Sequence, residues 1–87
     1  LYIGKGVKYF ERVGVGEFVL ESHDVKVGYR LIVTCPTTGY VEATVEEIRL
    51  DSGASVDKAI KGNTVAIRIP EKIRPSDKLY KVVSSDV

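Results

Sequence analysis

Hydrophobic and polar positions alternate along most of this chain, and the apolar residues do not recur with a helical period. Valine, isoleucine and threonine are frequent, and glycines interrupt the chain at short intervals. Alternating runs separated by turn residues are typical of short β-strands, whereas a period of about 3.6 would indicate amphipathic helices. The pattern predicts six strands, within residues 2–10, 13–20, 30–35, 40–51, 64–69 and 79–83.

Three of the predicted strands have a clear apolar face. These faces are formed by Ile3, Val7 and Tyr9, by Leu31, Val33 and Cys35, and by Val65, Ile67 and Ile69. The strand in residues 13–20 is apolar on both faces, and Gly14 and Gly16 within it indicate a bend or a close backbone approach. Residues 56–60 fit either a single helical turn or an irregular crossing, with Ala59 as the buried residue.

The run 40–51 cannot be one regular strand. Val41, Ala43 and Val45 share one parity, whereas Ile48 and Leu50 share the other. Successive side chains of a strand point to opposite faces, so both sets can be buried only if a residue is inserted or the chain bends. We therefore expect a bulge or sharp bend at the two glutamates between Val45 and Ile48.

The spacing of strands and turns predicts the fold class. Short strands with turns about every ten residues indicate an all-β fold, a small six- or seven-stranded antiparallel barrel with Greek-key-like connections. Closure into a barrel removes the exposed edges that a strand with two apolar faces would otherwise present. The 87 residues, 44% of them hydrophobic, allow one domain. We expect it to span residues 1–83, followed by a frayed tail at 84–87.

Composition excludes several classes of protein. No apolar run is long enough to span a membrane, and no signal segment opens the sequence, so we expect a cytoplasmic protein. One cysteine and one histidine are too few for a zinc or iron–sulfur site, so we expect no metal and no cofactor. The chain begins at Leu1 and is apolar from its first residue, which favours either a piece of a longer protein or a chain whose leader has been removed.

Three groups of residues resemble catalytic or metal-binding chemistry, and each has a simpler interpretation. Ser22, His23 and Asp24 are triad-type residues, but neighbours in an extended chain diverge, so a polar turn is favoured. Cys35 has no cation near it in sequence, so we expect a small buried residue. The acidic residues between positions 42 and 57 lack calcium-loop spacing and indicate a solvated face. We therefore expect no catalytic residue in this chain.

The distribution of charge is more informative than the net charge of +1. Basic residues predominate in residues 1–12 and 68–81, whereas residues 42–57 carry five acids against Arg49. If the first and last strands pair, the two basic segments form one face that could bind RNA phosphates or a charged partner domain. The candidate residues of this basic and aromatic face are Lys5, Lys8, Tyr9, Arg12, Arg68, Lys72, Arg74, Lys78 and Tyr80. We expect it to lie away from Glu42, Glu46 and Glu47. A solvated charged face of a structural barrel is the alternative.

Several segments, in order, resemble known β-barrel domains. Val25-Lys26-Val27-Gly28 before a strand, with Val45-x-x-Ile48 and Ala59-x-x-Gly62-x-x-Val65-x-Ile67, resembles the second domain of elongation-factor-Tu-like translation factors. Further motifs restrict the resemblance to one family of such domains. They are Ile3-Gly4-Lys5, Val7-x-Tyr9-Phe10, Gly14-Val15, Pro36-Thr37-Thr38-Gly39 and Lys72-x-Arg74-Pro75-x-Asp77-x-x-Tyr80-Lys81-Val82. Together these motifs, over residues 2–83, resemble the C-terminal domain of the U-32 (collagenase-like) peptidase family. One departure is Tyr29, which stands where the related domains have an aspartate after the glycine.

The resemblance implies a context rather than a site. In that family the barrel follows a larger catalytic domain, which carries the iron–sulfur cysteines and the catalytic residues. Some members are regarded as peptidases or collagenases, and others hydroxylate RNA bases or quinone precursors. No catalytic residue of the larger domain corresponds to a position in this chain.

Three hypotheses for function follow. The first is a non-catalytic accessory barrel of a U-32-type enzyme, which positions a peptide or collagen substrate or braces the catalytic domain of the parent chain. The second is a translation-factor-like module that binds RNA such as tRNA, or the equivalent domain of a family member that hydroxylates RNA bases. The third is a purely structural interaction domain. The oligomeric state is not indicated.

Overall fold

The structure is a computed structural model that describes residues 1–36 and 39–83, and the described part consists of strands and turns. No helix in that part is long and apolar enough to cross a membrane. The predicted tail at 84–87 and the middle of the predicted turn at 36–39 lie outside the described residues. The strands are β1 (Tyr2–Phe10), β2 (Val15–Leu20), β3 (Asp24–Lys26), β4 (Arg30–Cys35), β5 (Gly39–Thr44), β6 (Ile48–Leu50), β7 (Ser55–Val56), β8 (Lys58–Ile60), β9 (Thr64–Arg68) and β10 (Lys78–Lys81).

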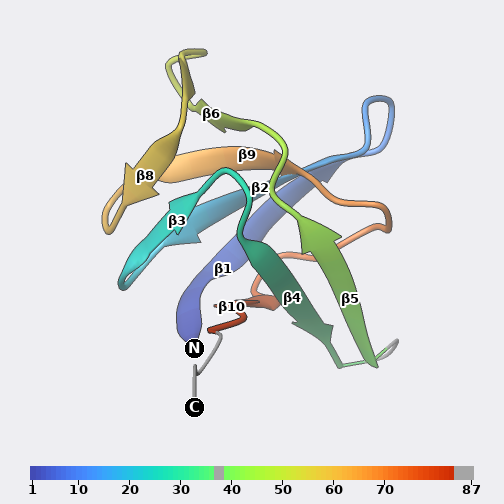
Figure 1. Cartoon of the computed structure of the whole chain (residues 1–87). Coiled ribbons are helices and arrows are strands. Elements are labelled where there is room, and N and C mark those ends of the chain that lie inside the picture. The colour runs from blue at the N-terminus through green and yellow to red at the C-terminus, as the bar shows by residue number, and fades with distance from the viewer. Residues whose placement is uncertain (37–38, 84–87) are drawn as a thin grey trace.

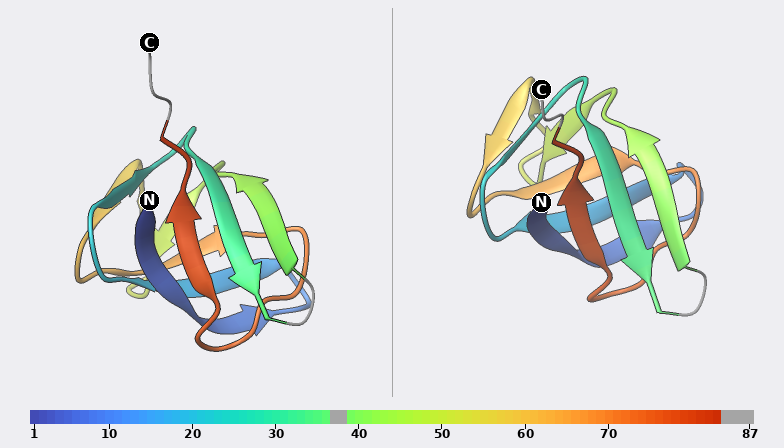
Figure 2. Two further views of the ribbon diagram at one scale, coloured as in Figure 1. Left: turned by 90° about the horizontal axis from the view of Figure 1, so that it is seen from below. Right: turned by 60° about the horizontal axis from the view of Figure 1, so that its bottom comes forward.

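Eight of these strands form one antiparallel sheet in the order β5-β4-β10-β1-β2-β9-β6-β7, and β3 pairs with β8 in a separate ribbon. Figures 1 and 2 show β4 and β5 crossing over the layer that contains β1, β2 and β9. The predicted all-β antiparallel class is confirmed, and β1 and β10 pair as expected. The described strands are more numerous and shorter than predicted, because residues 40–51 divide into two strands, residues 55–60 contribute two more and residues 24–26 contribute another. The helical turn considered as one alternative for residues 56–60 is therefore wrong. The expectation that Ala59 is buried is confirmed.

The predicted bend between Val45 and Ile48 is confirmed. Pairing of β5 with β4 stops at Thr44, pairing of β6 with β9 starts at Ile48, and both Val45 and Ile48 are buried. The backbone N–H of Val45 donates to the carbonyl of Tyr29 (2.8 Å), and the N–H of Gly28 donates to the carbonyl of Val45 (2.8 Å). The bend thus carries the chain from one end of the eight-stranded sheet to the strands near its other end.

The same two hydrogen bonds explain how the turn before β4 is held without the aspartate of related domains. The N–H of Tyr29 also donates to the carbonyl of Lys26 (3.1 Å), and Gly28 takes a positive φ of 98° that suits glycine. The ring of Tyr29 packs against the core and lies 5.0 Å from the ammonium nitrogen of Lys81. Backbone pairing and a cation–π contact therefore replace the carboxylate.

Close backbone contact and irregular register shape β1. A Cβ at Gly4 would lie 2.2 Å from the carbonyl oxygen of Val19 on β2, and a Cβ at Gly16 would lie 3.0 Å from the Phe18 ring. The close approach predicted near Gly16 is confirmed. The pairing of β1 with β2 shifts register between Gly6 and Lys8, which turns Val7 outward with 41% of its surface exposed. The prediction that Val7 shares the buried face of Ile3 is therefore wrong.

One apolar cluster fills the interior. Its largest fully buried side chains are Phe18, Ile3, Leu20, Leu31, Ile48, Ile67, Ile69, Ile73, Leu79, Val25, Val33 and Val45. The predicted faces of β4 and of β9 with its extension to Ile69 are confirmed as buried. Because these residues come from every part of the chain, the core forms only when strands distant in sequence pair.

We predict that two valine-to-alanine substitutions of identical chemistry have very different effects on stability. Val45→Ala removes a buried side chain at the bend and should lower the free energy of unfolding by about 2 kcal/mol. Val7→Ala, at an exposed position, should change it by no more than about 0.5 kcal/mol. Urea denaturation of both variants measures the difference, and equal effects would contradict the bend and the outward turn of Val7.

Candidate functional site

Pairing of the first and last strands brings some of the predicted basic residues together. Lys5 of β1 and Lys78 of β10 are register partners, so their exposed side chains stand on the same outer face. The turn before β10 lies against β1, because the N–H of Ser76 donates to the carbonyl of Gly6 (2.8 Å). Arg74 begins that turn and is exposed. Lys5 and Lys78 therefore share one surface, and Arg74 is an exposed cation in the turn that leads to it.

Two tyrosines complete this surface. Tyr2 and Tyr80 are register partners whose rings meet edge to face, 5.7 Å apart at an interplanar angle of 72°. The hydroxyl of Tyr2 donates to the carboxylate of Glu21, and this hydrogen bond is the main cause that raises the pKa of Tyr2 to about 12. Glu21 also lies 3.8 Å from the ammonium of Lys5. We call Tyr2, Lys5, Arg74, Lys78 and Tyr80 the β1–β10 face.

Three other predicted residues lie at the β1–β2 hairpin or contact it. Lys72 forms an ion pair with Glu11 at 2.9 Å, and the hydrogen bond from Lys72 holds the pKa of Glu11 below its usual range. Lys8 lies 5.0 Å from the centre of the Phe10 ring. Arg12 is exposed in the hairpin turn.

Arg68 and Tyr9, the remaining two predicted residues, line a cavity apart from the β1–β10 face. Arg68 shares a cavity of about 470 Å³ with Glu46, and its guanidinium donates to the carbonyl of Val13 (3.4 Å). The expectation that all the basic candidates lie away from Glu46 is wrong for Arg68, because the end of β9 reaches the bend that carries this glutamate. The hydroxyl of Tyr9 donates to the carbonyl of Ile69 (3.0 Å), so its polar end is engaged.

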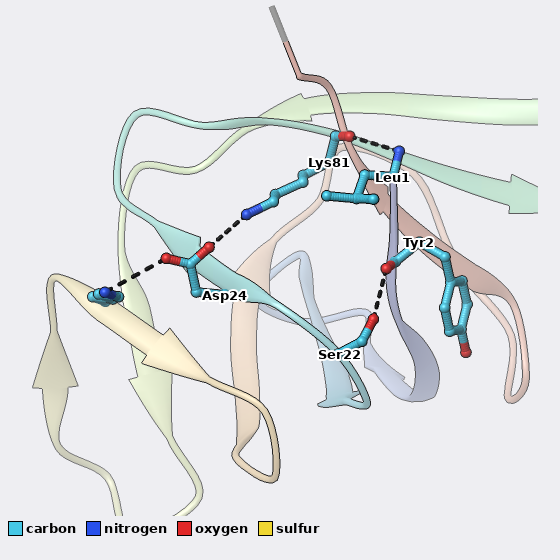
Figure 3. A network of polar contacts seen from close by, with 6 residues as sticks. Leu1, Tyr2, Ser22, Asp24 and Lys81 are labelled. Atoms are coloured by element: carbon cyan, nitrogen blue, oxygen red, sulfur yellow. Dashed lines mark hydrogen bonds and ion pairs between the residues drawn. The ribbon is translucent and has the colours of Figure 1, made fainter.

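The triad-type residues at positions 22–24 do not converge. Figure 3 shows Ser22 donating to the carbonyl of Tyr2 (2.9 Å) while Asp24 turns toward Lys81. His23 is exposed, with a positive φ of 61°. The three side chains thus have separate environments. Ser22 and His23 lie in a bend, in line with the predicted polar turn, whereas Asp24 is the first residue of β3.

Asp24 and Lys81 form a polar link that sequence reasoning missed. The ammonium of Lys81 donates to Asp24 at 2.5 Å, and Lys58 lies 3.6 Å from the same carboxylate (Figure 3). The side chain of Lys81 is only 11% exposed. The N-terminal ammonium of Leu1 donates to the backbone carbonyl of Lys81 (3.1 Å), and the backbone N–H of Lys81 donates to the carbonyl of Leu1 (2.8 Å). The link ties the β3–β8 ribbon to β10. Nothing in the sequence indicates that Lys81 points inward, because it lies among other basic residues.

The buried residue Asp77 is the second feature that sequence reasoning missed. Its side-chain oxygen Oδ2 accepts hydrogen bonds from the backbone N–H of Arg74 (2.8 Å) and from the thiol of Cys35 (3.1 Å). Only 3% of Asp77 and 6% of Cys35 are exposed. Cys35 is thus a buried residue, as predicted, and Asp77 closes the turn that carries Arg74 to the β1–β10 face.

Sequence comparison finds relatives that are much longer than this chain. It is 49% identical over 81 residues to a collagenase of Porphyromonas gingivalis strain W83, covering 93% of this chain and 19% of the relative. It is 32% identical over 78 residues to an uncharacterized protease of Methanocaldococcus jannaschii, covering 90% of this chain and 19% of that protein. The chain therefore spans about a fifth of the length of these curated relatives. No protein-family model matches it.

Structural comparison supports the fold. The C-terminal domain of a Geobacillus thermoleovorans protein assigned to the U32 peptidases superposes with a TM-score of 0.87 at 16% identity, over 94% of this chain and 92% of that domain. The selenomethionine variant of that domain gives a TM-score of 0.84 at 15% identity, over 91% of this chain and 96% of the domain. At this identity the likeness concerns the fold.

We predict that the link between Asp24 and Lys81 makes stability depend on pH. The hydrogen bond from Lys81 is the main cause that lowers the pKa of Asp24 from 3.8. Its stabilising contribution is therefore complete above about pH 4 and is lost as the pH falls through the lowered pKa. Asp24→Asn should reduce the free energy of unfolding by about 1.5 kcal/mol at pH 7.

Urea denaturation from pH 7 to pH 2 measures this difference, which should shrink as the wild type loses the contribution. Asp51→Asn, in an exposed turn, is the control and should show little difference at any pH. A difference between Asp24→Asn and wild type that stays constant down to pH 2 would argue against the link.

Proposed function

The chain belongs to the U32 (collagenase-like) peptidase family as a C-terminal-type domain, and from this premise we propose that it is a non-catalytic accessory barrel. In this proposal the barrel sits beside the catalytic domain of a longer protein. It either positions a macromolecular substrate or braces that catalytic domain.

The observation that carries the proposal is the separation of the residues that could have acted as a nucleophile and base. Ser22 and Asp24 bond different partners, His23 is exposed, and the thiol of Cys35 is buried against the carboxylate of Asp77. A working triad needs a nucleophile, a base and an orienting group in mutual contact. The relatives are about five times as long as this chain, which supports placing their chemistry in another part of the protein.

The β1–β10 face is the surface we assign to partner contact. It combines the exposed cations Lys5, Arg74 and Lys78 with the paired rings of Tyr2 and Tyr80. Tyrosine offers a large rigid contact area with a polar end, and exposed cations speed and orient docking on an acidic surface. An acidic surface of the catalytic domain or of a protein substrate would fit this face.

RNA binding is the second candidate function. The same face offers cations for phosphates and aromatic rings on which bases could stack, as single-stranded nucleic acids require. Three cations, one of them shared with Glu21, form a modest electrostatic surface, so protein contact is the favoured proposal.

We predict that charge reversal on the β1–β10 face weakens partner binding without unfolding the domain. Arg74→Glu and Lys78→Glu should each reduce affinity several-fold at low salt and flatten its salt dependence, because exposed charges act through screened attraction. The free energy of unfolding should change by no more than about 0.5 kcal/mol. Lys26→Glu, an exposed lysine on β3, is the matched control.

Binding is measured at several salt concentrations to the catalytic domain of a protein that contains this barrel, and separately to tRNA. An effect on tRNA alone, with a slope reduced by about 0.7 per lost single-strand phosphate contact, would favour the second candidate. Unchanged affinity for both would remove the β1–β10 face from the proposal. Gelatin cleavage by the 87-residue chain, lost in His23→Ala or Cys35→Ala, would contradict the non-catalytic role.

A further inference from the structure

The eight-stranded sheet has an open edge at β5. Among the described strands, β5 pairs only with β4, and it stands at the end of the strand order. Figure 2 shows it as the outermost strand beside β4. A strand in this position presents backbone N–H and C=O groups that a further extended chain could pair with.

The hydrogen-bond pattern identifies which residues of β5 point to this edge. The N–H of Val82 donates to the carbonyl of Arg30 (2.9 Å), so the backbone of Arg30 is directed toward β10. Backbone direction alternates along a strand, so the next residue, Leu31, is directed toward its register partner Ala43 on β5. The backbone groups of Ala43 thus point to β4, and those of Glu42 and Thr44 point outward.

The bend gives the open edge a cavity at one end. β9 pairs with β6 from Val65 to Ile67, and the continuation of the chain, Arg68 and Ile69, faces the end of β5 without pairing with it. The cavity of about 470 Å³ lies between these segments and is lined by Tyr9, Ala43, Thr44, Glu46, Arg68 and Pro70, among others. We call this cavity and the outer edge of β5 the seam.

One carboxylate at the seam is left without an ion pair. Glu42 is paired with Arg30 at 3.0 Å, and Glu47 with Arg49 at 3.4 Å. Within the described part of the chain, Glu46 forms no ion pair, and Arg68, which lines the same cavity, donates instead to the carbonyl of Val13, so the exposed carboxylate of Glu46 can meet a cation of a partner. The outward N–H and C=O groups of β5 favour a polypeptide over a nucleic acid, because a peptide backbone can pair with them.

We propose that the seam binds an extended polypeptide segment of a partner protein by β-strand addition. Its backbone pairs with the outward groups of Glu42 and Thr44, an apolar side chain enters the cavity beside Tyr9 and Pro70, and a neighbouring lysine or arginine meets Glu46. Extended peptides bind strand edges through main-chain hydrogen bonds, and pockets for alternate side chains add selectivity. This inference goes beyond the proposed function, because the seam is separate from the β1–β10 face. Peptide binding at the seam also does not depend on a catalytic domain.

The probe is an eight-residue peptide of alternating valine and threonine with one central lysine, tested by calorimetry against the 87-residue chain. Methylation of alternate backbone nitrogens, which removes the paired N–H groups, should weaken binding about tenfold or more. Thr44→Pro removes one outward N–H and should do the same, since proline is tolerated on an edge strand. Thr44→Val keeps that N–H and should therefore bind the peptide more tightly than Thr44→Pro does.

Two side-chain variants test the charge. Glu46→Lys should weaken binding of the lysine peptide several-fold, and Glu47→Lys, at the neighbouring glutamate already paired with Arg49, should have less effect. Far-ultraviolet circular dichroism confirms that each variant is folded. Equal affinity for the plain and methylated peptides, or no binding at millimolar concentration, would overturn the proposal. Dimerisation of the chain that Thr44→Pro abolishes would also overturn it, because the edge would then belong to a second copy.

Discussion

The bend between Val45 and Ile48 is the constraint on which the rest of the structure depends. Apolar parity changes there, so the chain must turn if both residues are to be buried, and two backbone hydrogen bonds to Gly28 and Tyr29 fix the turn. Because of the bend, residues 39–50 form β5 at one end of the sheet and β6 near the other end. The curled sheet, its shared core and the seam all follow from that division.

The sequence pattern was sufficient for the fold class because strand alternation and turn residues act locally. It located this bend from parity alone, and the buried faces of β4 and β9 from a period of two. It failed at Val7, because the register of β1 shifts against β2 between Gly6 and Lys8, and such a shift belongs to the pairing of two strands rather than to the pattern of one. Short strands such as β7 and β8 also escaped prediction, because two or three residues hold too little pattern.

The candidate site was harder to predict, because charge in sequence does not reveal direction in space. Lys5 and Lys78 meet since β1 pairs with β10, as the charge pattern suggested. Lys72 is instead paired with Glu11, and Arg68 lies beside Glu46 at the seam. Inward groups such as Asp77 and Lys81 depend on contacts between distant segments, which no local pattern encodes. The surface therefore divides into a cationic face and a separate open edge, and we propose a different kind of contact for each.

Native-state amide hydrogen exchange tests most directly whether the bend leaves β5 paired on one side only. The N–H groups of Ala43 and Val45, which point toward β4 and its preceding turn, should exchange slowly, as core amides do. Those of Glu42 and Thr44 point outward and should exchange orders of magnitude faster. Equal protection of all four amides in the monomeric chain would mean that β5 is paired on both sides, and the account would be wrong.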